Sequence, residues 1–117
     1  MEKRVELSCL LDYYGGLLTE RRRSLLEQAV YEDCSLSEIA EREGISRQGV
    51  RDALKRGEEQ LYEIEGKLHF LRRDAALRRL LSGLLQEAGT LREEEARRGI
   101  ASRVQTMIDI LEGEDGL

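Results

Sequence analysis

The feature that most constrains the fold is a run of apolar positions, spaced alternately four and three residues apart, between residues 50 and 75. Its members are Val50, Leu54, Gly57, Leu61, Ile64, Leu68, Leu71 and Ala75. This spacing is typical of the inner face of a bundled or coiled-coil helix. At a rise of 1.5 Å per residue, such a helix is roughly 39 Å long. A small helical head cannot cover that length, so the distal half is expected to pack on the chain's own C-terminal part or on another subunit.

Composition favours helices over sheets. The 117 residues include no proline and only 4% aromatic residues, whereas hydrophobic residues make up 40% and charged residues 37%. A near balance of aliphatic and charged residues is typical of amphipathic helices. We therefore predict an all-α protein of five or six helices. A head covers residues 1–60, and residues 61–117 form a helical extension and tail that pack on the long fourth helix within a single structural unit.

Helix boundaries follow from the capping residues. Ser35 and Glu38 have the spacing of a capping box, and Thr90 and Glu93 repeat it near the C-terminus. Gly44 suits the left-handed conformation that often ends a helix. The single-residue N-caps are Thr19 and Ser46. Four of the expected helices cover residues 3–14, 20–31, 35–43 and 91–111. A longer helical stretch runs from residue 47 to residue 88 and is divided into two helices by a break between residues 71 and 76.

Residues 36–51 have the pattern of a helix-turn-helix motif, in which a very short turn joins two helices. Ala40 is small where the two helices must approach each other, and Gly44 permits the turn. The apolar residues expected to fill the angle between the helices are Ile39, Ile45, Val50 and Leu54. The motif occurs both in DNA-binding proteins and in protein-binding modules, so it does not by itself assign a function.

In a DNA-binding version of the motif, the second helix lies in the major groove and its first residues contact base edges. The candidate DNA-binding residues are Ser46, Arg47, Gln48, Arg51, Lys55 and Arg56. Arginine suits the guanine edge and glutamine the adenine edge. Arg21, Arg22 and Arg23 are candidate phosphate contacts. The alternative interpretation is a solvated helix face with ion pairs between successive turns.

The negative charge is unevenly distributed along the chain. The chain carries −5, which argues against a protein that simply coats nucleic acid. Residues 81–117 hold four arginines and eight acidic residues, so −4 of the total lies there. Residues 44–57 hold four cations and one anion, Asp52. The acidity of the whole chain therefore says little about the helix-turn-helix.

The distal part of the apolar run is the candidate partner or dimer surface, and we expect a homodimer. Its residues are Leu61, Ile64, Leu68 and Leu71. The sequence shows no Gly-rich phosphate loop and no Cys/His or Ser/His pairing, so we expect no enzyme activity, catalytic residue, cofactor or metal site. No apolar run is long enough to span a membrane, and the N-terminus is unlike a secretory signal. A cytoplasmic location without membrane insertion is expected.

Several segments together resemble a known family. They are Leu-Leu-Asp-Tyr-Tyr at 10–14, Leu-Leu-Thr at 17–19, the stretch at 31–40 that ends in Ser-Leu-Ser-Glu-Ile-Ala, Ser-Arg-Gln-Gly-Val at 46–50, and Glu-Ile-Glu-Gly-Lys-Leu at 63–68. Over about residues 7–71 the chain resembles YlxM-like proteins, small bacterial helix-turn-helix proteins whose head is similar to region 4 of sigma factors. The resemblance implies a regulatory or accessory role in the signal recognition particle pathway, with the particle's GTPase or RNA as partner. The alternative is a sequence-specific DNA-binding transcriptional regulator.

Overall fold

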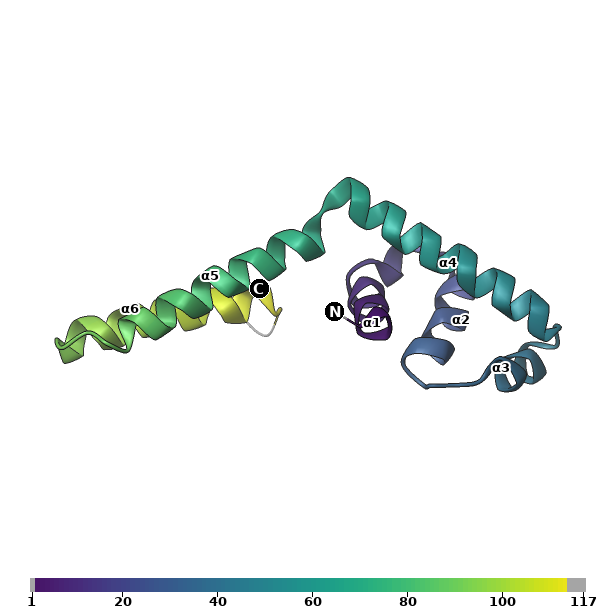
Figure 1. Cartoon of the computed structure of the whole chain (residues 1–117), viewed down its shortest axis with the longest axis horizontal. Helices are drawn as coiled ribbons and strands as arrows, with labels where there is room; N and C mark the ends of the chain where they lie inside the picture. Colours follow the sequence, from purple (N-terminus) through teal and green to yellow (C-terminus); the bar gives the residue numbers. More distant parts are fainter. Residues whose placement is uncertain (1, 114–117) are drawn as a thin grey trace. The chain divides into compact units, whose positions relative to one another are not determined.

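The computed structural model describes residues 2–113, and within this range the backbone is helical without any strand (Figure 1). The elements are α1 (Lys3–Tyr14), the 3-10 helix η1 (Gly15–Leu17), α2 (Glu20–Val30), α3 (Leu36–Glu43), α4 (Arg47–Leu68), α5 (Phe70–Ala88) and α6 (Glu94–Leu111). The predicted all-α class is therefore confirmed. The chain divides into two compact units, Met1–Leu71 and Arg72–Leu117. The expected packing of the tail on the fourth helix stays a prediction.

The helix starts in the first unit are set by the side chains that the sequence indicates. Thr19 and Ser46 each accept a hydrogen bond from the amide three residues further on, at 3.3 and 3.0 Å. Ser35 and Glu38 form the complete capping box, with reciprocal bonds of 3.1 and 3.0 Å. Gly44 ends α3 with a φ of +68°. These bonds satisfy amides that no helical carbonyl can reach, so local chemistry fixes where α2, α3 and α4 begin.

Removing the cap of α3 should destabilise the first unit measurably. We expect Ser35→Ala to lower the free energy of unfolding by about 1 kcal/mol, because the amide of Glu38 loses its acceptor. Urea denaturation followed by circular dichroism measures this change. Ser37→Ala is the matched control, since Ser37 is exposed and lies one residue inside the helix. Equal stability of the two variants would contradict the capping role of Ser35.

Two apolar clusters hold the first unit together. In Figure 1, α1, α2 and α3 lie along the same side of α4, which contacts all three. The larger cluster joins α1, α2 and α4 through Leu7, Leu10, Leu11, Tyr14, Leu18, Leu26 and Leu61. The smaller cluster joins α2, α3 and α4 through Leu25, Ile39, Ala40 and Val50, with Ile45 and Leu54 packed against it. The predicted interior of the helix-turn-helix is thus confirmed.

Gly57 lies where α4 approaches α2 closely. Its position is buried, and a Cβ atom placed on it would lie 2.8 Å from Leu26 Cδ1 and 3.3 Å from Arg22 Cγ. The sequence pattern makes Gly57 the weak point of the apolar run. The structure gives the residue a different role, because the absence of a side chain lets two helices meet over the larger cluster.

The distal apolar run needs a correction at Leu61. This residue has no exposed surface in the single chain, because it packs against α1 and α2 in the larger cluster. Ile64 and Leu71 are half-buried against the same cluster. Only Leu68, 41% exposed, presents a large free surface. The run between residues 61 and 71 is mainly intramolecular core, since α1 occupies the side that sequence analysis assigns to a partner.

The end of the fourth helix also differs from expectation. The predicted break lies between residues 71 and 76, whereas α4 ends at Leu68 and His69 adopts a left-handed conformation with a φ of +60°. Tyr14 donates its hydroxyl to Glu65 Oε1 at 2.5 Å, and the amide of Leu71 donates to the same oxygen at 3.1 Å. The amide of Phe70 donates to the Tyr14 hydroxyl at 3.2 Å.

These contacts supply acceptors to the first amides of α5 and hold the break in place. They also affect the phenol of Tyr14, whose pKa is raised by burial and by the hydrogen bond to Glu65. The side chains that hold the break therefore come from Glu65, four residues before it, and from Tyr14 of α1, far from it in sequence.

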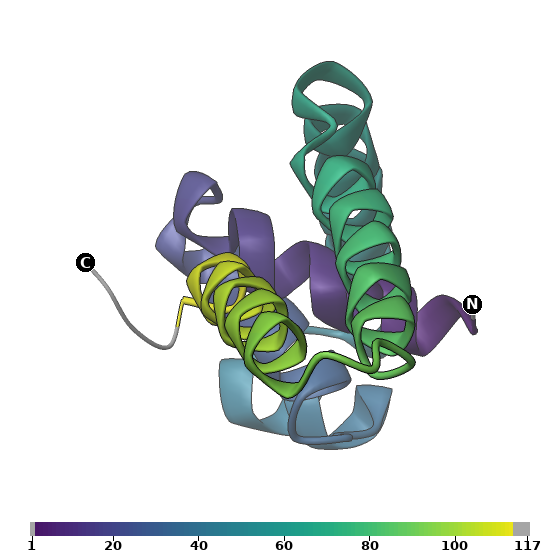
Figure 2. The same ribbon diagram turned by 90° about the vertical axis from the view of Figure 1, so that its left-hand side faces the viewer.

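The second unit contains α5 from Arg72 onward and all of α6, two helices joined by residues 89–93 (Figure 2). Its buried apolar residues are Leu81, Ala88 and Val104. The predicted capping box at Thr90 and Glu93 does not form. The Thr90 hydroxyl donates instead to the Glu87 carbonyl at 2.7 Å, and α6 begins at Glu94 without a side-chain cap. Within residues 2–113, every helix falls short of the length or apolarity needed to cross a bilayer.

Candidate nucleic-acid interface

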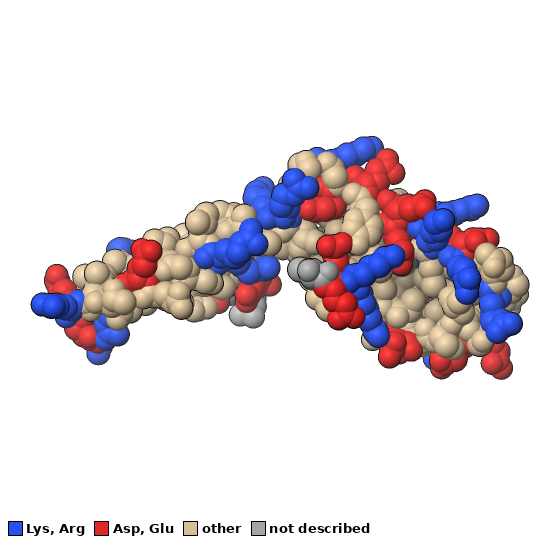
Figure 3. All heavy atoms as spheres, viewed as in Figure 1, with Lys and Arg blue, Asp and Glu red and all other residues tan. Residues whose placement is uncertain are grey.

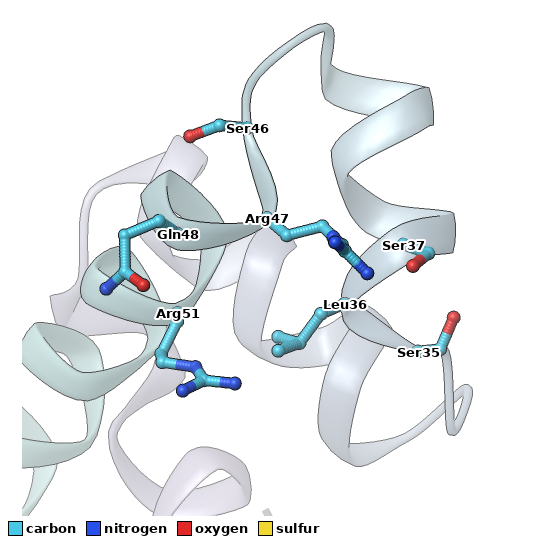
Figure 4. Close-up of a pocket in the computed structure, with 7 residues that line it drawn as sticks. All are labelled: Ser35, Leu36, Ser37, Ser46, Arg47, Gln48 and Arg51. Atoms are coloured by element: carbon cyan, nitrogen blue, oxygen red, sulfur yellow. The ribbon is translucent and has the colours of Figure 1, made fainter.

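The start of α3 and the start of α4 enclose a surface hollow of about 680 Å³. Its lining residues are Ser35, Leu36, Ser37, Ser46, Arg47, Gln48 and Arg51. Figure 4 shows the Arg47 side chain extending from the first turn of α4 toward Ser37, with Arg51 one turn further along. Four predicted DNA-binding residues therefore meet at one place. The other three residues, the N-cap and the first two residues of α3, were not predicted, because their proximity depends on the angle that the Gly44 turn sets between the helices.

Arg47, Arg51 and Lys55 form the basic face of α4. They are four residues apart, so they lie on one side of the helix over a length of about 12 Å. All three are exposed, and no ion pair to them occurs among residues 2–113. Figure 3 shows Lys and Arg side chains gathered over the N-terminal half of α4. The ion pairs of the alternative interpretation do not form at these three residues within the range 2–113, whereas a solvated face remains compatible with their exposure.

The polar residues beside the basic face, Gln48 and Ser46, form hydrogen bonds within α4. The Gln48 amide nitrogen donates to Asp52 Oδ1 at 2.9 Å, one turn further along α4. The Ser46 hydroxyl caps the helix by accepting from the amide of Gly49. To donate to an adenine edge, the Gln48 amide must leave Asp52 or turn its other hydrogen outward. Asp52 also places a negative charge at the flank of the basic face.

The remaining candidates lie elsewhere on the unit. Arg56 is about 140° around the helix from Arg51. With residues of α2 it lines a separate hollow of about 150 Å³, whose other members are Thr19, Arg21, Arg22, Leu25 and Ala53. The six DNA-binding candidates therefore do not share one surface, since Arg56 belongs to the hollow beside α2.

The three arginines proposed for phosphate contact differ in availability. Arg22 is half-buried and donates from Nη1 to Gln60 Oε1 at 2.5 Å. Arg23 forms an ion pair with Glu27 at 3.6 Å. Arg21 is exposed and forms no ion pair with a residue of the described range 2–113. It is the member of the trio best placed to contact a ligand.

The chemistry of the hollow suits an anionic partner. Two guanidinium groups and three hydroxyl-bearing residues line it, which provides donors for phosphate oxygens and base acceptors. Within the described part of the chain, no group of three His, Cys, Asp or Glu residues could hold a metal ion. The site is an exposed donor surface and lacks the enclosed apolar pocket in which catalytic groups are usually held.

Comparisons with known proteins agree with the helix-turn-helix architecture. Residues 1–100 match the model of the UPF0122 family, described as "Putative helix-turn-helix protein, YlxM / p13 like". A UPF0122 protein of Clostridium botulinum is 41% identical over 87 residues, covering 74% of this chain and 80% of the relative. One from Symbiobacterium thermophilum is 38% identical over 96 residues, covering 82% and 90%. One from Bacillus mycoides is 41% identical over 95 residues, covering 81% and 84%.

Proposed function

We propose, from the premise that the chain belongs to the UPF0122 family of YlxM / p13-like helix-turn-helix proteins, that it binds duplex DNA through α4. In this proposal the protein is a non-enzymatic, sequence-specific regulator. The observation that carries it is the basic face, formed by Arg47, Arg51 and Lys55 without ion pairs inside the described residues 2–113. Arg47 and Arg51 contact base edges or the adjoining phosphates, and Lys55 contacts the backbone further along the groove.

The hollow beside α3 supports the same docking. Ser35 and Ser37 lie across from Arg47, so a phosphate that enters the hollow receives donors from both helices. Arg21 and Arg56 lie in the second hollow and would contact a second stretch of backbone only if the DNA bends toward α2. For that reason we assign the specific contacts to Arg47, Gln48 and Arg51.

The resemblance to YlxM-like proteins implies a second function, that of an accessory in the signal recognition particle pathway. Its partner would be the particle's GTPase or RNA, and its place of action the cytoplasm. Lys67, an exposed cation beyond the basic face at the end of α4, favours this function if it leaves its ion pair with Glu63 at 3.3 Å to contact an acidic partner. The two functions differ in the role of α4, because only DNA binding requires base-edge contacts from the first two turns of this helix.

One binding experiment separates the two functions. The protein is incubated with a randomised duplex DNA pool, with the particle RNA and with the particle GTPase, each at low and at physiological salt. Selection of a common DNA sequence at physiological salt is the expected result, since base-edge contacts persist when the phosphate contribution is screened. Loss of all DNA binding at that salt, with RNA or GTPase binding retained, would overturn the DNA proposal in favour of the accessory role.

Arg51→Ala tests the basic face directly. We expect roughly tenfold weaker binding to the selected duplex, because the side chain lies at the centre of the face and is a candidate for bidentate contact. Arg103→Ala removes the same charge from the exposed surface of α6 and should change the affinity less than about twofold. Fluorescence anisotropy at one salt concentration measures both affinities. An unchanged affinity for Arg51→Ala would exclude α4 as the reading helix.

A further inference from the structure

The second unit leaves large apolar side chains exposed on both of its helices. On α5 they are Leu77, Leu80 and Leu84, and on α6 they are Ile100, Met107 and Ile110. Leu80 is 67% exposed and Ile110 is 52% exposed. Isolated exposed leucines are common on protein surfaces, whereas a continuous apolar patch of several hundred Å² marks an interaction site. The six residues therefore indicate an interaction site only if they share one face.

Helical spacing and the surface hollows both place them on one face. On α5 the exposed residues follow the three-four spacing and flank the buried Leu81 and Ala88 on the same side. The exposed residues of α6 flank the buried Val104 in the same way. One hollow of about 260 Å³ is lined by Leu77, Leu81, Met107, Ile110 and Leu111. A second of about 190 Å³ is lined by Leu84, Glu87, Ala88, Leu91 and Ile100.

Each hollow thus joins exposed residues of α5 to exposed residues of α6. We name the six exposed residues (Leu77, Leu80, Leu84, Ile100, Met107 and Ile110) the hairpin face. Within the described residues of this unit, only Leu81, Ala88 and Val104 are buried apolar residues. So small a core does not stabilise two helices in water, and units of this size usually depend on a further packing partner.

We propose that the hairpin face is covered by the same face of a second copy of the chain, so that two α5–α6 pairs form a four-helix arrangement about a two-fold axis. The six side chains expose on the order of 500 Å² per copy, so that pairing buries about 1,000 Å², the lower limit for a specific interface. Side chains at the rim of the face add to this area. The proposal is independent of nucleic-acid binding by the first unit.

The chemistry of the face selects a second copy over a charged partner. All five residues that line the larger hollow are apolar, so the hollow offers nothing to a phosphate or to a charged peptide. The face combines a projecting side chain, Leu80, which is 67% exposed and lines neither hollow, with two hollows on the same surface. A two-fold axis places the projection of one copy opposite the hollows of the other, as in bundled helices. This interface differs from the seam predicted from the sequence, whose member Leu61 is buried within the single chain.

Leu80→Glu tests the proposal in the full chain. Sedimentation equilibrium of the unchanged protein should give the mass of two chains at tens of micromolar. The substitution should raise the dissociation constant of the dimer roughly 100-fold, because the two-fold axis introduces two carboxylates into one apolar interface. Leu17→Glu is the matched control, since Leu17 is 61% exposed on η1 of the first unit, and it should leave the dimer intact.

Three outcomes would overturn the proposal: a monomeric unchanged protein at these concentrations, an undiminished dimer in Leu80→Glu, or equal dissociation in Leu17→Glu. Circular dichroism verifies that each variant keeps its helices. If Leu80→Glu loses helix, Ile110→Ser provides the milder test at a second half-exposed position, and here too an undiminished dimer would contradict the proposal.

Discussion

Replacing Leu61 by alanine should lower the free energy of unfolding of the Met1–Leu71 unit by about 3 kcal/mol. The side chain has no exposed surface and packs with Leu10, Leu11 and Leu26 between three helices. Truncation removes buried methyl groups and leaves a cavity, because α1 and α2 are fixed by their own contacts and cannot collapse into the space. Chemical denaturation followed by circular dichroism measures the change.

Leu68→Ala is the control for this prediction. Leu68 belongs to the same apolar run but is 41% exposed at the last residue of α4, so the loss should stay below about 1 kcal/mol. The two variants separate a core role from a partner role for the run. If Leu61→Ala were as stable as Leu68→Ala, and if its stability varied steeply with protein concentration, the run would be a subunit interface after all.

Gly57→Ala should destabilise the first unit by about 2 kcal/mol even though it adds a good helix former. The new methyl group would lie 2.8 Å from Leu26 Cδ1, and that side chain is itself only 1% exposed and cannot move aside freely. The contact must be relieved by moving α2 away from α4 or by distorting Leu26, and overpacking of this kind typically costs about 1–3 kcal/mol.

Gly66→Ala is the control within the same helix. Nothing lies within 4 Å of a Cβ atom at Gly66, so alanine there has only the effect of higher helix propensity. We expect a gain of about 0.5–1 kcal/mol, the opposite sign from Gly57→Ala. Thermal and urea denaturation of both variants give the comparison. A stabilised Gly57→Ala would mean that α2 and α4 are farther apart than the structure places them.

Features encoded within a few residues could be predicted from the sequence. The capping box at Ser35 and the turn at Gly44 depend on neighbours less than six residues away. The apolar plug at Ile45 packs against a cluster that includes Ala40 and Val50, each five residues away, as well as the distant Leu25. The basic face of α4 could also be predicted, since residues four apart on a helix share a side whatever the tertiary structure. This local character explains why the helix-turn-helix could be identified and why four of its candidate residues line one hollow. Their contact with DNA stays a prediction.

Features that depend on distant contacts could not be predicted. Arg56 lies with Arg21 because α2 packs beside α4, and no spacing in the sequence indicates that neighbour. The break at His69 carries neither glycine nor proline, so the pattern of residues 50–75 is compatible with an uninterrupted helix. The Thr90 pattern failed for a different, local reason, because the Thr90 hydroxyl donates to the carbonyl of Glu87, three residues earlier, and does not cap α6.

The break at His69 has a consequence for the order in which the chain folds. A left-handed residue other than glycine costs roughly 1–2 kcal/mol, and the acceptors that offset this cost come partly from Tyr14, 56 residues before Phe70. Until α1 closes the loop between Tyr14 and Phe70, local interactions favour one continuous helix through residue 69. The end of α4 at this break is thus a late product of folding, formed cooperatively with the first core.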